Sequence, residues 1–223
     1  MYLIELSDYS LPATGSGSGL KNIYFAVSGG DVCFIQSESI NDAHLFLKAL
    51  ATLVRPYNGT YRYMGETLDF SDYRKLLPFK KRIGYIGQDA AMISNRTIRE
   101  NLLLLRYYFE NSLSLELDKN VVQLCNLFDL QDKLDIRPGE LRPVELRTAI
   151  AIRELAKSLD ILLLERPEDY FGHSKLDLFN QILKANIEQG HAVVFSSNDQ
   201  NFIEAFSNRK IRIADGTLTK ISN

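Results

Sequence analysis

Tryptophan is absent from the 223 residues, and the chain has only two cysteines and three histidines. Cys33 and Cys125 lie far apart and lack the short spacings of metal ligands, which excludes a disulfide-rich scaffold and a cysteine-based zinc site. We therefore expect both residues to be reduced, buried thiols in a cytosolic protein.

Long apolar runs are also lacking. The longest, such as Leu102–Leu105, are far too short to span a bilayer, so any membrane association is expected to be peripheral. The net charge is −2 without a basic excess, which argues against a nucleic-acid partner. The first residues, MYLIELSDY, lack the basic segment and apolar core of a signal peptide. The hydrophobic content of 45% is that of an ordinary soluble globular protein.

The most informative stretch that is present runs from Leu141 to Pro167. Leu141–Lys157 has apolar residues at helical spacing and predicts a helix. Ile161–Leu164 is a short, unalternating apolar run, which is typical of a strand buried on both faces of a parallel sheet. Glu165 follows this run directly, and α/β proteins bind ligands at the carboxyl ends of such strands.

This stretch resembles the signature helix and Walker B strand of the ATPase subunits of ATP-binding cassette (ABC) transporters. The family reads LSGGQ, a helix of the type RVAIARAL, four apolar residues and DEP. The match needs no gap, and Pro167 falls on the family proline. Order and spacing agree from Leu3 to Ile221, and RIGYIGQD, which contains Gln88, resembles the start of the family's Q-loop.

The resemblance implies an α/β protein with an ABC-type, P-loop NTPase-like fold. Such a fold has a mixed sheet core, an antiparallel β part and a helical subdomain. The single domain would span 1–223, with its core at about 1–89 and 158–223 and its helical subdomain at about 90–157.

The phosphate loop of this family depends on glycines, a lysine and a hydroxyl, and the chain has none of them in place. Glycines let backbone N–H groups cradle phosphates, lysine binds the β- and γ-phosphates, and Ser or Thr binds magnesium. Ser37 and Asp42 stand at the two glycine positions, Ala43 at the lysine and His44 at the hydroxyl. Asp42 and Glu38 also bring negative charge to a place meant for a triphosphate, which is unfavourable.

The signature motif has changed as well, because LSGGQ is replaced by Leu141, Arg142, Pro143, Val144 and Glu145. The family motif implies a site where N–H groups at a helix N-terminus contact phosphate. Pro143 has no N–H to donate, and Val144 has a Cβ where close approach needs none. Arg142 leaves a contact with an anion open, whereas the simpler interpretation is that Pro143 begins the helix.

The catalytic positions after the buried strands complete the comparison. Glu165 falls on the magnesium-binding aspartate, and Gln88 falls on the Q-loop glutamine, so these two are the candidate metal ligands. Arg166 stands at the catalytic glutamate, and a guanidinium cannot accept a proton from water. We expect Arg166 to pair with Glu165, Glu168 or Asp42 instead. Asn198 occupies the place of the switch histidine.

These replacements favour a degenerate ABC subunit that is structural or regulatory and does not hydrolyse ATP, so that no cofactor is expected. It would dock a membrane permease through a groove at 90–96, alone, as a homodimer or with a second ABC ATPase subunit, on the cytoplasmic face of the membrane. The segment 93–110 resembles the Mla/Mce lipid-transport group, which suggests lipid transport.

Two alternatives stay open. One is a working ATPase with an atypical site, which would bind ATP and magnesium through Gln88, Glu165 and Arg142. The other is a soluble interaction module that has kept the ABC fold and no longer meets a permease. Enzymatic activity is therefore undecided by the sequence, and so are the transported substrate, the direction of transport and the oligomeric state.

Overall fold

The computed structural model describes residues 1–110 and 115–221, with the backbone alone at 172–174. Its centre is a six-stranded sheet in which four neighbouring pairs are parallel and the pair formed by the two C-terminal strands, at one edge, is antiparallel. In spatial order its strands are β10 (Thr217–Ile221), β9 (Arg209–Ala214), β3 (Val32–Ser37), β8 (Ala192–Ser196), β7 (Ile161–Glu165) and β6 (Ile83–Ile86). Every residue of β7 is buried, as its unbroken apolar run predicts.

A second, four-stranded sheet is antiparallel and lies beside the first. Its strands are β2 (Leu20–Val27), β1 (Ile4–Leu11), β4 (Asn58–Tyr63) and β5 (Glu66–Thr67). The two sheets meet where the Lys21 N–H donates to the carbonyl of Gly216 at 2.8 Å. A Cβ on Gly216 would lie 2.7 Å from the carbonyl oxygen of Gly19, and its φ is +79°, so this contact requires glycine.

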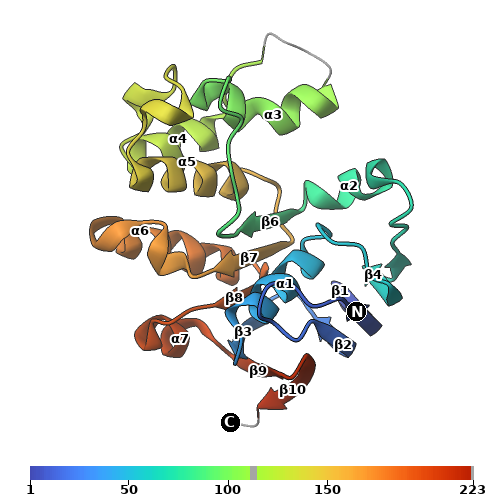
Figure 1. Ribbon diagram of the computed structural model, residues 1–223. Coiled ribbons are helices and arrows are strands. Elements are labelled where there is room, and N and C mark those ends of the chain that lie inside the picture. The colour runs from blue at the N-terminus through green and yellow to red at the C-terminus, as the bar shows by residue number, and fades with distance from the viewer. Residues whose placement is uncertain (111–114, 222–223) are drawn as a thin grey trace.

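Seven α-helices surround the sheets in the described part of the chain. They are α1 (Ile40–Leu50), α2 (Leu77–Lys80), α3 (Ile98–Glu110), α4 (Lys119–Leu127), α5 (Pro143–Leu155), α6 (Gly172–Glu188) and α7 (Gln200–Phe206). Figure 1 shows α1 beside the antiparallel sheet, α6 and α7 against the six-stranded sheet, and α3, α4 and α5 gathered on the side of β6, which α5 contacts. Two hydrophobic cores follow from this arrangement.

The mixed sheet, the antiparallel part and the group of helices confirm the predicted fold class. Helices α3, α4 and α5 all fall within the predicted helical segment 90–157. The division into a core at 1–89 and 158–223 and a subdomain stays a prediction, and its ranges include 111–114 and 222–223, which lie outside the described residues. No helix among the described residues is both long and apolar enough to cross a membrane. Cys33 and Cys125 are buried and unbonded, as expected.

Candidate functional site

The carboxyl ends of β3, β6, β7 and β8 meet at one edge of the six-stranded sheet, where parallel α/β proteins place ligands. Two small cavities lie there. One of about 190 Å³ is lined by residues that include Ser37, Ala43, Glu165, Arg166 and Asn198. The other, of about 260 Å³, is lined by Ile40, Asn41, His44, Gln88, Asp89 and Glu165. The fold thus gathers the predicted phosphate-loop, Walker B, Q-loop and switch positions.

His44 and Glu165 bond directly across this edge. Nδ1 of His44 lies 2.9 Å from Oε1 and 2.8 Å from Oε2 of the Glu165 carboxylate. Glu165 is only 2% exposed and also accepts the backbone N–H of Gln88 at 2.9 Å. A buried carboxylate needs such partners because desolvation without them is costly. Protein groups therefore already occupy the oxygens of Glu165.

The imidazole of His44 is held between two carboxylates. Its Nε2 atom lies 3.6 Å from Asp89 Oδ2, and Lys48 pairs with the same Asp89 oxygen at 2.6 Å. The hydrogen bond to Glu165 raises the pKa of His44 above its ordinary value, although burial acts in the opposite direction. A protonated imidazole donates from both nitrogens, so His44 can serve both acids at once.

Gln88 contributes to the site through its backbone. Its N–H binds Glu165, whereas its side chain is exposed. The hydroxyl of Tyr85, three residues earlier, lies 3.5 Å from the same carboxylate oxygen. The structure therefore places Gln88 beside Glu165 as predicted, but the contact is made by the N–H and not by the amide that would bind a metal.

Asp42 stands at the second glycine position of the phosphate loop and binds a neighbouring loop of the protein. It is 2% exposed, and its carboxylate accepts the N–H groups of Ser18 at 3.1 Å and Gly19 at 3.0 Å. The loop that follows β1 thus folds over the first turn of α1. This approach needs glycine, because a Cβ on Gly17 would lie 2.4 Å from Asp42 Oδ1. An anion favours a helix N-terminus, and here the protein supplies its own.

Arg166 does not pair with Glu165, Glu168 or Asp42, so that prediction is wrong. Its guanidinium instead pairs with Asp169 at 3.1 Å, because the 3₁₀ turn that starts at Pro167 brings the residue three positions on back over it. Glu168 accepts the hydroxyl of Ser197 at 2.9 Å and the N–H of Asn198 at 2.8 Å.

The backbone of Arg166 is strained. Its φ of 51° and ψ of 64° are left-handed, a conformation that costs a non-glycine residue about 1–2 kcal/mol. Its Nε is also buried, with no hydrogen-bond partner among the described residues. Neither feature follows from a pattern in the sequence.

The residues at the signature position lie elsewhere, and none of Arg142, Pro143, Val144 and Glu145 lines the two cavities. Helix α5 begins at Pro143, as the simpler interpretation of the sequence has it. Glu145 accepts the Arg142 backbone N–H at 2.9 Å and its Nε at 2.7 Å, and pairs with Lys133. The Arg142 side-chain bond and then Lys133 lower the pKa of Glu145 to about 2. Arg142 is therefore engaged within its own helix.

The residues at this edge do not fit a magnesium–nucleotide complex. Ala43 offers no cation, and the Glu165 carboxylate is bonded to His44. Asp42, at the second glycine position of the phosphate loop, puts a negative charge in the first turn of α1 where the family has none. Within the ranges that the structure describes, no group of three or more histidine, cysteine, aspartate or glutamate side chains could hold a metal ion.

Sequence reasoning missed several partners in the site: Ser18, Gly19, Lys48, Tyr85 and Asp89. One signal was present, because His44 and Lys48 are four positions apart on α1 and therefore share a helix face. No sequence pattern predicts the contacts of Ser18 and Gly19, because their backbone N–H groups reach Asp42 only when the folded chain brings the loop to α1.

A groove also lies beside the predicted docking segment 90–96. It has a volume of about 410 Å³ and is lined by residues that include Lys48, Leu53, Lys80, Asp89 and Ala90. Arg153, which also lines it, donates to the carbonyl of Ala91 at 2.8 Å. Charged and apolar side chains thus line this groove together.

The mixed six-stranded sheet, the antiparallel sheet beside it and the surrounding helices define an α/β protein. Its structure matches "Dimeric Structure of MJ0796, a Bacterial ABC Transporter Cassette" with a TM-score of 0.82, at 21% identity and with 99% of each chain covered. The post-hydrolysis dimer of the same cassette bound to ADP and Pi gives a TM-score of 0.81 at 20% identity.

Sequence relatives point to the same family. The macrolide export ATP-binding/permease protein MacB of Campylobacter jejuni is 27% identical over 205 residues, which are 92% of this chain but 32% of MacB, so the chain spans about a third of that relative. The hemin import ATP-binding protein HrtA of Staphylococcus haemolyticus is 25% identical over 89% of this chain and 90% of its own length. No protein-family model matches.

The chain is thus similar in sequence and in fold to the ATP-binding proteins of ABC transporters. The lipid-transport group gains no support, because the relatives reported are named for macrolide export and hemin import.

Proposed function

We propose that this protein is an ABC ATP-binding-subunit homologue that does not bind or hydrolyse Mg-ATP in the family manner and acts as a structural or regulatory subunit. The observation that supports this most is the bond from His44 Nδ1 to the Glu165 carboxylate, at 2.8 Å and 2.9 Å. The imidazole takes the place that the family resemblance gives to magnesium.

Electrostatics at the phosphate loop supports the same proposal. A metal ion would have to displace His44 from Glu165, and a triphosphate would meet no lysine at position 43, while Asp42 adds negative charge to the first turn of α1. Like charges a few ångströms apart repel by several kcal/mol at the effective dielectric constant near a protein surface, on the order of 4 kcal/mol at 4 Å. Binding through the family's groups is therefore unfavourable at both ends of the ligand.

The proposed partner is a membrane permease, and the proposed location is the cytoplasmic face of the membrane. MacB is named as an ATP-binding/permease protein, and the MJ0796 cassette is titled as a dimer. By analogy we propose that this chain meets a permease through the groove beside Ala90, as a homodimer or with a second ABC ATPase subunit. Lipid transport stays a prediction from one sequence segment.

Calorimetric titration with Mg-ATP tests the proposal. We expect neither heat nor thermal stabilisation of the wild-type chain at millimolar Mg-ATP. The matched comparison is D42G/A43K/H44T/R166E, which restores the family's groups at four positions, and we expect this variant to gain binding. One-to-one binding by the wild type would overturn the proposal in favour of an atypical ATPase, which phosphate release would then measure. A chain that binds neither Mg-ATP nor any permease in co-purification would be an interaction module.

A further inference from the structure

A polar cavity lies at the edge of the six-stranded sheet that is opposite to the candidate site. Its volume is about 370 Å³. Arg82 and His191 line it and directly precede β6 and β8, and Leu159, also in the lining, lies two positions before β7. Because these strands run parallel, their first residues meet at one edge. Residues of α4, of the end of α5 and of the end of α6 complete the lining, and none of the ABC motif positions contributes to it.

Arg82 is held in place at this edge by Asp160. Its Nε and Nη2 atoms bond to the two oxygens of that carboxylate, and the hydroxyl of Tyr63 donates to the same group at 2.6 Å. Within residues 1–110 and 115–221, Nη1 of Arg82 has no hydrogen-bond partner. A bidentate pair thus orients the guanidinium and leaves two of its N–H groups for a ligand.

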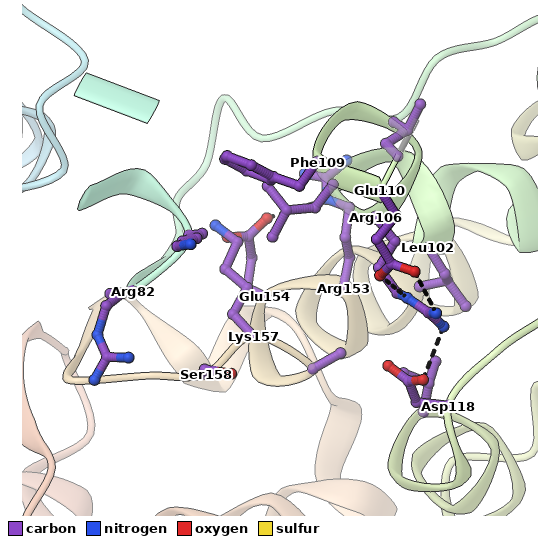
Figure 2. Close-up of a pocket in the computed structure, with 15 residues that line it drawn as sticks. Arg82, Leu102, Arg106, Phe109, Glu110, Asp118, Arg153, Glu154, Lys157 and Ser158 are labelled. Atoms are coloured by element: carbon purple, nitrogen blue, oxygen red, sulfur yellow. Dashed lines mark hydrogen bonds and ion pairs between the residues drawn. The ribbon is translucent and has the colours of Figure 1, made fainter. Parts of the chain in front are cut away.

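The charged groups around the cavity leave an excess of positive charge. Glu154 pairs with Arg153 at 3.0 Å and with Lys157 at 2.5 Å, so one carboxylate serves two cations. Figure 2 shows these side chains in the neighbouring cavity, which shares Lys157 and Arg82 with this one. Lys80 has no ion pair in the part of the chain that the structure describes, and burial followed by the charge of Lys157 lowers its pKa. A field of this sign favours an anion.

The rest of the lining combines buried leucines with exposed amides. Leu124, Leu155 and Leu159 are 6–7% exposed and form an apolar wall. Asn120 and Gln189 are exposed, and their side-chain amides have no hydrogen-bond partner among the described residues. The described lining contains no aspartate or glutamate. An apolar wall with a few polar groups is the usual composition of a small-molecule site.

The imidazole of His191 is fixed beside this wall by Asn186. Nδ2 of Asn186 donates to the carbonyl of Ile182 at 2.8 Å, so its amide oxygen is the atom that faces Nδ1 of His191, 3.0 Å away. Because an amide oxygen only accepts, Nδ1 carries the proton of the neutral ring. The ring of His191 therefore has one orientation and can report on what enters the cavity.

We propose that this cavity binds a small organic oxyanion, a carboxylate or a phosphate ester, whose charged oxygens accept from Arg82 and from the amides of Asn120 and Gln189. The carbon part of the ligand packs on the leucine wall. The excess positive charge selects an anion, and the volume lies within the range of small-molecule sites. The inference does not rest on the proposed function, because it uses none of the residues at the ABC motif positions.

Histidine-ring NMR of the full chain tests the proposal, because the chain has only three histidines and one of them lines the cavity. The probes are succinate, its neutral diamide succinamide, and inorganic phosphate. At millimolar concentrations we expect succinate and phosphate to shift the ring signals of His191 in a saturable way, and succinamide to leave them unchanged. H191Q assigns these signals.

Two variants of exposed glutamines on α6 form a matched pair. Q189E adds a negative charge to the cavity and should weaken succinate binding by about fivefold, the size of one exposed ion-pair interaction. Q181E adds the same charge outside the lining and should leave binding unchanged. R82Q should weaken binding at least as much as Q189E. Its thermal unfolding is measured in parallel because it also loses the pair with Asp160, and Q189E decides the test if R82Q does not fold.

Three results would overturn the proposal: no saturable shift of His191, equal shifts with succinamide and succinate, or equal weakening by Q189E and Q181E. A shift of the His44 signals without one of His191 would also overturn it, since the anion would then bind at the opposite edge of the sheet. The relative affinities of succinate and phosphate show whether the site prefers a carboxylate or a phosphate, and either order supports an oxyanion site.

Discussion

The Nδ1 atom of His44 lies 2.8 Å from Oε2 of Glu165, although 121 positions separate the two residues. The hydrogen bond joins the first helix, α1, to the end of strand β7. It also brings a titratable cation to a carboxylate that is 2% exposed. The stability of the fold should therefore depend on the protonation of one imidazole.

We expect stability to fall as the pH rises through the folded-state pKa of His44. Because the hydrogen bond to Glu165 raises this pKa above 6.5, the contribution is complete below 6.5 and is lost above the raised value. H44Q should lower the free energy of unfolding at pH 6 by about 2 kcal/mol and flatten its pH dependence. Urea denaturation from pH 6 to 9 measures both effects. H191Q is the control, and an unchanged slope in H44Q would contradict the assignment.

Asp42 should hold the loop before β2 against α1. D42A removes the acceptor of two backbone N–H groups, at Ser18 and Gly19, and should destabilise the protein by about 1–3 kcal/mol. Hydrogen exchange at those two amides should accelerate, while exchange in β7 should follow global stability alone. D42N keeps one acceptor oxygen and should have a smaller effect. Unchanged protection at Ser18 and Gly19 in D42A would refute this role.

Glu145, in the first turn of α5, should make the stability of the protein depend on pH in the acid range. Its pKa is about 2, below the ordinary 4.5, so its contribution to stability is present above 4.5 and is lost as the pH falls towards 2. E145Q should lose this dependence. Its cost at pH 7 should stay below about 1 kcal/mol, because the Arg142 side chain is 81% exposed. Thermal melts between pH 2 and 5 test the expectation, and parallel curves for E145Q and wild type would contradict it.

Arg166 should be more replaceable by glycine than by alanine. Both substitutions remove the ion pair with Asp169, but only glycine adopts a φ of 51° without strain. We expect R166G to be more stable than R166A by about 1 kcal/mol, as measured by thermal unfolding. Equal stabilities would show that the left-handed backbone carries no strain here.

The sequence predicts the strands and the fold well because their signals are local or repeat the family spacing. The strand predicted at Ile161–Leu164 is observed as Ile161–Glu165, and the helix predicted at Leu141–Lys157 runs from Pro143 to Leu155. The site is harder to predict, because its chemistry lies in pairs that only the fold creates. The resemblance puts His44 and Glu165 at neighbouring positions of one site, yet their direct bond depends on rotamers.

Arg166 illustrates the limit of charge complementarity as a guide. Three acids were predicted as its partners, and it pairs with a fourth, Asp169, three residues on. The choice follows from the turn at Pro167, whose geometry sets which carboxylate is within reach. Opposite charges in a sequence therefore identify candidates, and local backbone geometry selects among them.

The imidazole of His44 is covalently attached, so this partner of Glu165 is present in every molecule, and its charge follows the pH and not the supply of a ligand. A protein that gains this charge from a dissolved ligand is stabilised by an amount that follows the free ligand concentration. Here the Glu165 carboxylate is bonded to a side chain of the same protein, so the local concentration of its partner does not change with the concentration of any ligand in the cell. The acid at the end of β7 would keep this partner alike in a starved cell and in a growing one.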